Sequence, residues 1–303
     1  ICAEGEDPKT IKAARHLKES LGSIPILVGR EHKIKAILDD LGQSADGMEI
    51  QNAAVNPNLD DYIKLTYQKL QRKGYLYRDC SKMVKTDKNI FAACLLESGL
   101  GDSLVTGNTK NYSNAFADVS KIISAKQPGA IFSYYMLIKQ TRHLMIIDPK
   151  DGNSCPEKLA YIAKQAAQIN SALGIPAKVA FISHANFTEC NYAATILKAI
   201  QILDQEKVSF QYDGAMLPDI ALDHSSMSLY TFCKLSGPAN ILIMPNTETT
   251  LISLALLNKS SSSSYIIGPI LSGFTKSIQI VQTSVNASEI INLATISLAS
   301  ELA

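Results

Sequence analysis

Several features that would point to particular classes of protein are missing from the sequence. Residues 277–303 contain no lysine, arginine or histidine. No apolar run reaches the roughly 20 residues of a membrane-spanning helix, and no basic-then-apolar leader opens the chain. The six cysteines are widely spaced without a C-x-x-C pair, which argues against zinc and against a disulfide framework. We therefore expect a reduced, cytoplasmic protein without a membrane partner.

The charges are balanced, with 29 basic and 28 acidic side chains. The scattered lysines offer no field or stripe for nucleic acid, which we exclude as a partner. Apolar residues make up 46% of the chain, as in a packed globular protein, and 303 residues suffice for two domains. The chain begins at Ile1, inside an expected strand and without a methionine, so we expect it to be part of a longer protein.

Apolar runs with strand character alternate with longer helical patterns. Each run is continuous, as expected for a strand that is covered on both faces. Asp7 and Pro8 form a typical helix start, with a capping acid before a proline. This alternation predicts a parallel, doubly wound α/β architecture. The four clearest runs are 24–29, 103–107, 178–183 and 239–245.

One stretch breaks this alternation. Residues 132–138 and 143–148 are predicted to form two adjacent antiparallel strands joined by a short polar turn. The Pro-, Gly- and Asp-rich segment that begins at Asp148 is the predicted domain boundary. Capping boxes are expected at Ser154–Glu157, opening a helix that runs through Leu173, and at Asn286–Glu289 before the last helix.

Gly99 and Gly101 suggest a nucleotide-binding loop, but the dinucleotide fingerprint needs a third glycine where Leu104 stands. The loop should also follow a strand, whereas the preceding residues have a helical pattern. We interpret Gly99 as the residue that ends a helix.

Two other arrangements could carry chemistry. Ser183 and His184 are neighbours in an expected strand, so their side chains point in opposite directions and do not form a nucleophile–base pair. Asp219 and Asp223 would share one face of a helix and could hold a divalent cation, although we favour the interpretation of an acidic helix start near solvent. The histidines lack partners at metal-ligand spacing.

Eight stretches together match one family in order along the chain. They are AEGEDPKTIKAA (3–14), ILVGR (26–30), GLGDSLVTGNTKNY (99–112), DPKDGNSCPEKLAYIA (148–163), FISHANF (181–187), YDGAMLPDIALD (212–223), ANILIMPNTE (239–248) and GPILSGFTKS (268–277). In these stretches the chain resembles the phosphate acetyl/butyryltransferase family. The similarity is greatest to its branch in hybrid malic enzymes, where a phosphotransacetylase-like domain follows the catalytic domain. AEGED and GNTKNY carry that closer likeness.

The resemblance implies two doubly wound α/β domains around a cleft, a phosphotransacetylase fold similar to that of isocitrate dehydrogenases. We predict a first domain of residues 1–147 plus 285–303 and a second of residues 148–284.

Active members of the family carry a Ser-Arg pair in the pattern S-R-G-x-S-x-x-D-I-V, where a guanidinium can hold phosphate bidentately. Here Gln282 and Thr283 stand at the Ser and Arg positions, and Glu289 stands at the Asp position. A second family arginine corresponds to Lys85 or Thr86, and lysine offers a point charge without the fork. The family's usual Ala-Gly-Asn step is replaced by 249–251, a Thr-Thr-Leu sequence.

These departures imply a domain that binds acetyl-CoA or CoA without catalysing acyl transfer, and that contains no catalytic residue and no metal. NAD(P) and a divalent metal would belong only to the upstream malic enzyme domain, and the domain would help to hold a homo-oligomer together. One alternative is an active phosphate acetyltransferase that uses Lys85 or Lys276, and another is a purely structural, oligomerising domain. The predicted ligand-lining residues are Lys85, Thr86, Lys276, Gln282, Thr283 and Glu289.

Overall fold

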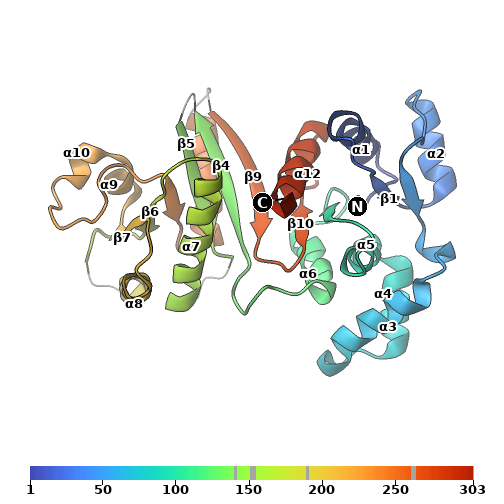
Figure 1. Ribbon diagram of the computed structural model, residues 1–303, viewed down its shortest axis with the longest axis horizontal. Helices are drawn as coiled ribbons and strands as arrows, with labels where there is room; N and C mark the ends of the chain where they lie inside the picture. The colour runs from blue at the N-terminus through green and yellow to red at the C-terminus, as the bar shows by residue number, and fades with distance from the viewer. Residues whose placement is uncertain (140–141, 151–154, 189–190, 261–263, 303) are drawn as a thin grey trace. The chain divides into compact units, whose positions relative to one another are not determined.

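The computed structural model describes residues 1–139, 142–150, 155–188, 191–260 and 264–302 (Figure 1). The chain forms two compact units, the first from 1–126 with 274–303 and the second from 127–273. Among the described helices, none combines the length and the apolar character needed to cross a lipid bilayer.

The sheet of the first unit is entirely parallel and is centred on Cys2. This residue bridges both β1 and β3, so the strand order is β2–β1–Cys2–β3–β10. The chain starts at the centre, runs outward to β2 and then crosses to the other side, so the winding reverses between Cys2 and β3. The strands are β1 (Ile26–Val28), β2 (Glu49–Gln51), β3 (Ser103–Thr106) and β10 (Ser277–Ile280).

Helices cover this sheet on both faces. Helix α1 packs on α12, which contacts β3 and β10, while α5 and α6 pack together and also contact these strands. In Figure 1, α12 and α6 lie on opposite sides of β10. The helices are α1 (Pro8–Leu21), α2 (Glu31–Asp40), α3 (Leu59–Leu70), α4 (Tyr77–Thr86), α5 (Lys88–Glu97), α6 (Tyr112–Ile122) and α12 (Ala287–Leu302), with 3-10 turns at Ala53–Val55 and Gln71–Lys73.

The predicted starts of the first and last helices are confirmed. Asp7 accepts hydrogen bonds from two backbone N–H groups in the first turn of α1, and Pro8 is the first helical residue. At α12, the N–H of Glu289 donates to Asn286 Oδ1 at 2.9 Å, and the N–H of Asn286 donates to Glu289 Oε2 at 3.0 Å. This reciprocal pair is a capping box, which satisfies two otherwise unpaired donors.

The second unit contains a six-stranded mixed sheet in the order β7–β6–β8–β5–β4–β9. Strand β4 is antiparallel to both β5 and β9, which confirms the predicted antiparallel pair, whereas the other pairs are parallel. The strands are β4 (Phe132–Lys139), β5 (Arg142–Asp148), β6 (Lys178–Ile182), β7 (Gln211–Met216), β8 (Ile241–Ile243) and β9 (Ser264–Ser272). The helices are α7 (Pro156–Ala172), α8 (Asn191–Glu206), α9 (Pro218–Leu222), α10 (His224–Met227) and α11 (Thr247–Ser260).

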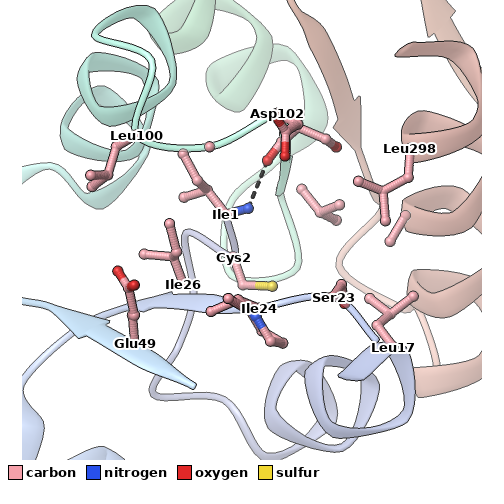
Figure 2. A pocket seen from close by; sticks show the side chains of 15 residues that line it. Ile1, Cys2, Leu17, Ser23, Ile24, Ile26, Glu49, Leu100, Asp102 and Leu298 are labelled. Carbon is pink, nitrogen blue, oxygen red and sulfur yellow. Dashed lines mark hydrogen bonds between the residues drawn. The ribbon is translucent and has the colours of Figure 1, made fainter. Parts of the chain in front are cut away.

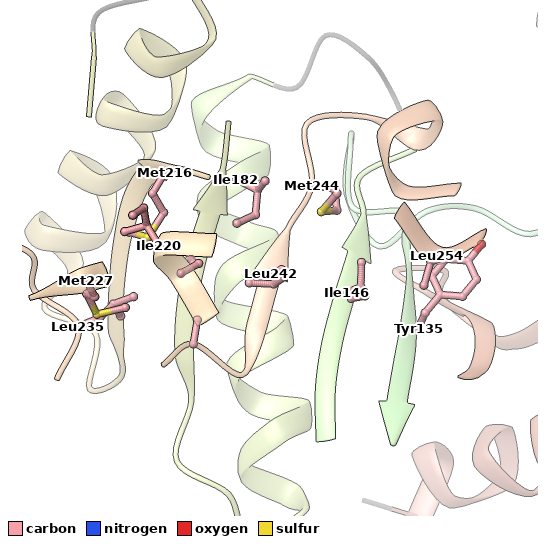
Figure 3. Close-up of a cluster of buried hydrophobic side chains, with 13 residues drawn as sticks. Tyr135, Ile146, Ile182, Met216, Ile220, Met227, Leu235, Leu242, Met244 and Leu254 are labelled. Atoms are coloured by element: carbon pink, nitrogen blue, oxygen red, sulfur yellow. The ribbon is translucent and has the colours of Figure 1, made fainter. Parts of the chain in front are cut away.

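The core of the second unit follows the two-residue period of its strands. Ala180 and Ile182 of β6 belong to a buried cluster with Leu242 of β8, Ile220 of α9 and Leu254 of α11 (Figure 3). On the opposite side, α7 contacts β6 and β8, and α8 contacts β7. The strands are thus buried on both faces, which explains why their sequences are continuous apolar runs.

The domain boundaries differ from the predicted ones. The boundary expected at 147/148 lies at 126/127, because β4 pairs with both β5 and β9 and so belongs to the second unit. The return expected at 284/285 lies at 273/274, because β10 pairs with β3. Pairing partners, which composition does not reveal, decide both positions.

The start of α7 also differs from the prediction. Its N-cap is Cys155, without a side-chain capping bond, and Ser154 lies outside the described residues. The helix ends at Ala172, with Leu173 as the C-cap, and Gly174 takes the left-handed conformation with φ 75°.

Candidate functional site

Polar side chains gather where the parallel strands of the first unit end. We call this region the carboxyl edge, and it comprises residues 3–7, 29–30, 107–111 and 281–286 together with 87–89 at the start of α5. Ligands of open α/β sheets bind outside the carboxyl ends of the strands, at the point where the winding reverses. Here that point lies between Cys2 and β3, next to Glu4 and Gly107.

Glu4 is a buried carboxyl group at the centre of this edge, with 3% of its surface exposed. Its Oε1 accepts from the Gly107 N–H at 2.9 Å and from the hydroxyl groups of Thr106 at 3.1 Å and Thr109 at 3.5 Å. Burial raises the pKa of Glu4, and these hydrogen bonds and the charge of Lys88 only partly oppose the effect. The segments AEGED and GNTKNY therefore meet in space.

The hydroxyl group of Thr106 has two acceptors but only one proton. Besides its contact with Glu4, Thr106 Oγ1 donates to Asn89 Oδ1 at 2.7 Å. The second hydrogen must come from a proton on Glu4 or from the nitrogen of a reversed Asn89 amide, because one hydroxyl group donates only once.

The amide groups of Asn89 and Asn108 complete this group of residues around Glu4, which we call the central cluster. Asn108 Nδ2 donates to Thr10 Oγ1 at 2.9 Å. Asn108 Oδ1 and Asn89 Nδ2 are buried, and neither has a hydrogen-bond partner within the described part of the chain. One acceptor and one donor thus remain unused close to the Glu4 carboxyl group.

The cations around this cluster are held by carboxylates of the same unit. Arg30 grips Glu6 with Nε and Nη2, at 3.0 and 2.8 Å from the two carboxylate oxygens. The hydrogen bond from Arg30 lowers the pKa of Glu6 to about 2. Lys88 lies 3.6 Å from the same carboxylate.

Lys110 is similarly engaged, at 2.5 Å from Asp87 and 2.6 Å from Asp118. Burial opposes ionisation of Asp118, but hydrogen bonds from Lys110 and Lys121 outweigh it and lower the pKa of Asp118. Arg30, Lys88 and Lys110 at the carboxyl edge therefore each face an anion, whereas Lys9 Nζ reaches the edge at 2.9 Å from the Val285 carbonyl.

Three of the predicted ligand-lining residues lie at this edge. Gln282 and Thr283 directly follow β10 and are exposed. They are placed beside the central cluster because the N–H of Val281 donates to the Thr106 carbonyl at 2.8 Å. Glu289 is exposed and closes the capping box of α12, so its position has a structural explanation.

Lys85 and Thr86 form the last turn of α4 and are exposed. Thr86 Oγ1 donates to the Lys82 carbonyl at 2.8 Å. They precede the start of α5, whose Asn89 is part of the central cluster. Within the described residues, no recorded hydrogen bond or ion pair links these two to Gln282 or Thr283.

Lys276 lies apart from the predicted residues at the carboxyl edge, and its role as a ligand-lining residue stays a prediction. Lys276 precedes β10, whereas Gln282 follows it, so the two residues lie at opposite edges of the sheet. At about 3.3 Å per residue, six steps along an extended chain separate their backbones by roughly 20 Å. The lysine is the last cation of the chain, but it stands at the other end of the strand.

A cavity of about 350 Å³ lies at the opposite, amino edge of this sheet (Figure 2). Its lining mixes apolar residues such as Leu17 and Leu298 with the carboxylates of Glu49 and Asp102. None of the six predicted residues lines it. Because parallel sheets bind ligands at their carboxyl ends, we assign the functional site to the carboxyl edge.

The other candidates do not form sites. Gly99, with φ 80°, follows α5 and ends it as interpreted. Ser183 is buried after β6, whereas His184 is exposed. Asp219 lies in α9, but Asp223 is extended and caps α10, so the two do not share a helix face as the metal-site hypothesis required.

The central cluster was not predicted. The sequence comparison singled out AEGED and GNTKNY, but not Glu4, Asn89 or Asn108 as site residues. The signal in the sequence that could have identified them is their position, because Glu4 and Asn108 closely follow strands of a parallel sheet.

The substituted step at 249–251 lies in α11, where Thr250 is buried and Leu251 is exposed.

Comparison with known proteins identifies relatives along nearly the whole chain. Residues 1–298 match the phosphate acetyl/butaryl transferase family. The chain is 43% identical over 312 aligned residues to a probable NADP-dependent malic enzyme of Rickettsia prowazekii, covering 97% of this chain and 40% of that protein. It is 23% identical to the phosphate acetyltransferase of Bacillus subtilis, covering 100% of this chain and 94% of that enzyme.

Solved structures agree on the fold. A phosphotransacetylase from Streptococcus pyogenes superposes with a TM-score of 0.87 at 23% identity, covering 99% of this chain and 93% of that one. This likeness confirms the predicted α/β phosphotransacetylase fold. The chain spans about 40% of the length of the malic enzymes that it matches.

Proposed function

Because the chain belongs to the phosphate acetyl/butaryl transferase family, we propose that it is a phosphotransacetylase-like regulatory domain of a malic enzyme. In this proposal it binds acetyl-CoA or CoA at the carboxyl edge and does not transfer acyl groups. Oxidative decarboxylation of malate, with NAD(P) and a divalent metal, belongs to an upstream domain. The support is a 43% identical relative, described as a probable NADP-dependent malic enzyme, that is more than twice as long.

The absence of acyl transfer is argued from the charges at the carboxyl edge. Phosphate attack on a thioester places additional negative charge in the transition state, and a fixed, available cation is the usual means of stabilising it. Gln282 and Thr283 carry no charge, and Arg30 is held by both oxygens of Glu6. Loss of one such group typically costs about 10²–10³ in rate. The observation that carries the proposal is that the motif positions Gln282 and Thr283 are uncharged while Arg30, Lys88 and Lys110 are paired with carboxylates.

Binding of a CoA thioester is compatible with the same groups. Pantetheine carries two amides, which need donors and acceptors rather than charge. Gln282 and Thr283 are exposed polar groups that can serve these amides, whereas the unpaired Asn89 Nδ2 and Asn108 Oδ1 are buried behind the surface of the edge. Lys85 is the exposed cation that we assign to the phosphates of the ligand. Binding of this kind stabilises no transition state.

A regulatory effect requires acetyl-CoA to bind one arrangement of the protein better than another, because equal affinity shifts no equilibrium. We assign that differential affinity to the carboxyl edge. Homo-oligomerisation through this domain and a cytoplasmic location complete the proposal.

The decisive measurement follows thiol release from acetyl-CoA with and without phosphate, together with the melting temperature of the protein. We expect no phosphate-dependent release and a melting temperature that rises with acetyl-CoA. Ligand at 100 times its dissociation constant stabilises the folded state by about 2.7 kcal/mol. Release at ordinary enzymatic rates would instead establish the alternative, an active phosphate acetyltransferase. If acetyl-CoA causes neither thiol release nor a rise in melting temperature, the remaining alternative is a purely structural domain.

A matched pair of charge reversals tests where the ligand binds. Lys85→Glu changes a lysine near the carboxyl edge, whereas Lys276→Glu makes the same change at the amino edge. We expect Lys85→Glu to weaken acetyl-CoA binding about tenfold, as isothermal titration calorimetry would show, and Lys276→Glu to leave it unchanged. Equal effects of the two variants would contradict the assignment of the site.

A further inference from the structure

Another cavity lies within the second unit, beside the edge strand β7. Its volume of about 350 Å³ suits a small molecule. Helix α8 contributes Leu197 and Ile200 to its wall, and the segments after β6 and after α10 contribute Phe187 and Phe232. We call it the β7-edge pocket. Because its wall is mainly apolar, its few polar groups decide which ligand it can accept.

Asp213 is the acidic group of this pocket and is buried, with 7% of its surface exposed. Its Oδ1 accepts from the Gly214 N–H at 2.8 Å, and its Oδ2 accepts from the Lys234 N–H at 2.6 Å. Both oxygens thus act as acceptors, as they do in an ionised carboxylate. Buried charges are usually paired with an opposite charge. Among the described residues, however, no cationic side chain forms an ion pair with Asp213.

The ammonium group of Lys234 does not fill this role, because it is paired elsewhere. Its Nζ lies 3.0 Å from each carboxylate oxygen of Asp204 and 5.7 Å from the centre of the Tyr212 ring. Hydrogen bonds from Tyr212 and Lys234 lower the pKa of Asp204, which keeps it ionised. The two carboxylates and one ammonium group therefore leave a net charge of about −1, which favours a monovalent cation as the ligand.

Aromatic side chains gather at the same pocket. The rings of Phe187 and Phe232 meet edge to face with their centroids 4.9 Å apart, and the Tyr230 ring lies 5.1 Å from that of Phe187. The face of an aromatic ring attracts a cation, and sites for quaternary ammonium ligands are built from such rings. Phe232 is 65% exposed, so its ring is open to a ligand. A buried carboxylate and several rings are the groups that an organic ammonium ion requires.

The backbone holds Phe187 in a conformation that bulky residues rarely adopt, with φ +52°. Its N–H donates to the Ala215 carbonyl at 2.7 Å, and Asn186 Oδ1 accepts from the Leu217 N–H at 2.7 Å. These two bonds tie the segment to the end of β7. Uncommon backbone conformations cluster at ligand sites. Since the Phe187 ring is already in place, binding needs little reordering, which lowers its cost.

We propose that the β7-edge pocket binds a small organic ammonium cation. Asp213 supplies the negative charge, and Phe187 and Phe232 contact the substituents of the nitrogen. Leu197 and Ile200 bury the attached carbon chain. This site lies within the second unit, and the inference does not rest on acetyl-CoA binding at the carboxyl edge.

Choline provides the first test. Its neutral analogue, dimethylbutanol with a carbon atom in place of the nitrogen, has the same shape and lacks the charge. We expect NMR titration of the protein to give choline a dissociation constant on the order of 1 mM, since so small a ligand buries little surface. Choline should bind at least about tenfold more tightly than dimethylbutanol, and it should shift the resonances of Gly214, Phe187 and Phe232. Failure of choline to bind, equal affinities for the two ligands, or shifts confined to other residues would each overturn the proposal.

Variants of the pocket provide the second test. Asp213→Asn should weaken choline binding at least about tenfold and leave dimethylbutanol binding unchanged, which separates loss of charge from loss of structure. Because Asp213 is buried, Phe232→Ala adds a change at an exposed position and should weaken choline binding about two- to fivefold. Leu229→Ala is its control, since this 79% exposed leucine of the same segment does not line the pocket. Melting temperatures check that each variant is folded.

Two outcomes of this second test contradict the proposal. One is an Asp213→Asn protein that binds choline as tightly as wild type. The other is an equal effect of Phe232→Ala and Leu229→Ala on choline binding, which remains informative even if Asp213→Asn does not fold.

Discussion

Gly107 allows β3 and β10 to approach each other where the carboxyl edge begins. Its φ is +111°, a conformation that residues with a side chain rarely adopt. A Cβ built on this glycine would lie 2.5 Å from the Val281 carbonyl oxygen and 3.0 Å from Ile280 Cγ2. The Gly107→Ala variant must therefore both strain its backbone and displace the chain that leads to Gln282.

The size of the effect can be separated into two parts. The positive φ costs an alanine about 1–2 kcal/mol. Overpacking against backbone that cannot move freely typically costs a further 1–3 kcal/mol. We expect Gly107→Ala to lower the free energy of unfolding of the first unit by about 2–5 kcal/mol, the sum of the two parts.

Gly99→Ala is the matched control. Gly99 also has a positive φ, +80°, but a Cβ there would meet nothing within 4 Å. Urea unfolding should therefore show a loss of only about 1–2 kcal/mol for Gly99→Ala, since the cost of the positive φ acts alone. Both glycines lie in the first unit, so one transition reports on both variants. Equal losses would refute the argument that close approach of Val281 constrains Gly107.

Two further predictions concern titratable groups. Because burial raises the pKa of Glu4 in the folded state, the folded protein binds the proton more tightly and loses stability as the pH rises above the unfolded value of about 4.3. Glu4→Gln, which cannot ionise, should show a smaller loss of unfolding free energy between pH 5 and pH 8 (roughly the range over which a raised carboxyl pKa acts), and a parallel pH profile would contradict this reasoning. Burial also raises the pKa of Cys94 to about 11, so a thiol-reactive dye should label exposed Cys155 in the native protein and Cys94 only after unfolding. Rapid labelling of Cys94 in the native protein, mapped by mass spectrometry, would show that the Cys94 side chain is not buried.

Much of the fold could be predicted because the strands are buried on both faces. The runs at 24–29, 103–107, 178–183 and 239–245 contain β1, β3, β6 and β8. Strand β2 was missed, since it is a three-residue edge strand with partly exposed side chains and no apolar run. The domain boundaries were misplaced because strand pairing across more than a hundred residues leaves no local mark.

The candidate site was only partly predictable for a related reason. Gln282 and Thr283 were located by aligning a motif, and the structure places them at the carboxyl edge. Lys276 was selected for its charge, but the strand between it and Gln282 carries them to opposite edges. Glu4 was missed because a sequence does not show that an acidic residue will be buried. Its burial depends on Gly107, which is distant in the sequence and follows the neighbouring strand β3.

The second unit is inserted between two adjacent strands of the first, and this has a consequence for the order of folding during synthesis. β3 ends at Thr106, but its neighbour β10 begins only at Ser277, after the whole of 127–273 has been made. At about 5–20 residues per second, the ribosome needs roughly 7–30 s to cover that stretch. The contiguous second unit can fold in this interval, while β3 remains an unpaired edge whose backbone groups are open to other chains. A chaperone that binds this protein co-translationally should therefore protect the first unit. Of the two units, it starts to be translated before the second and is completed after it.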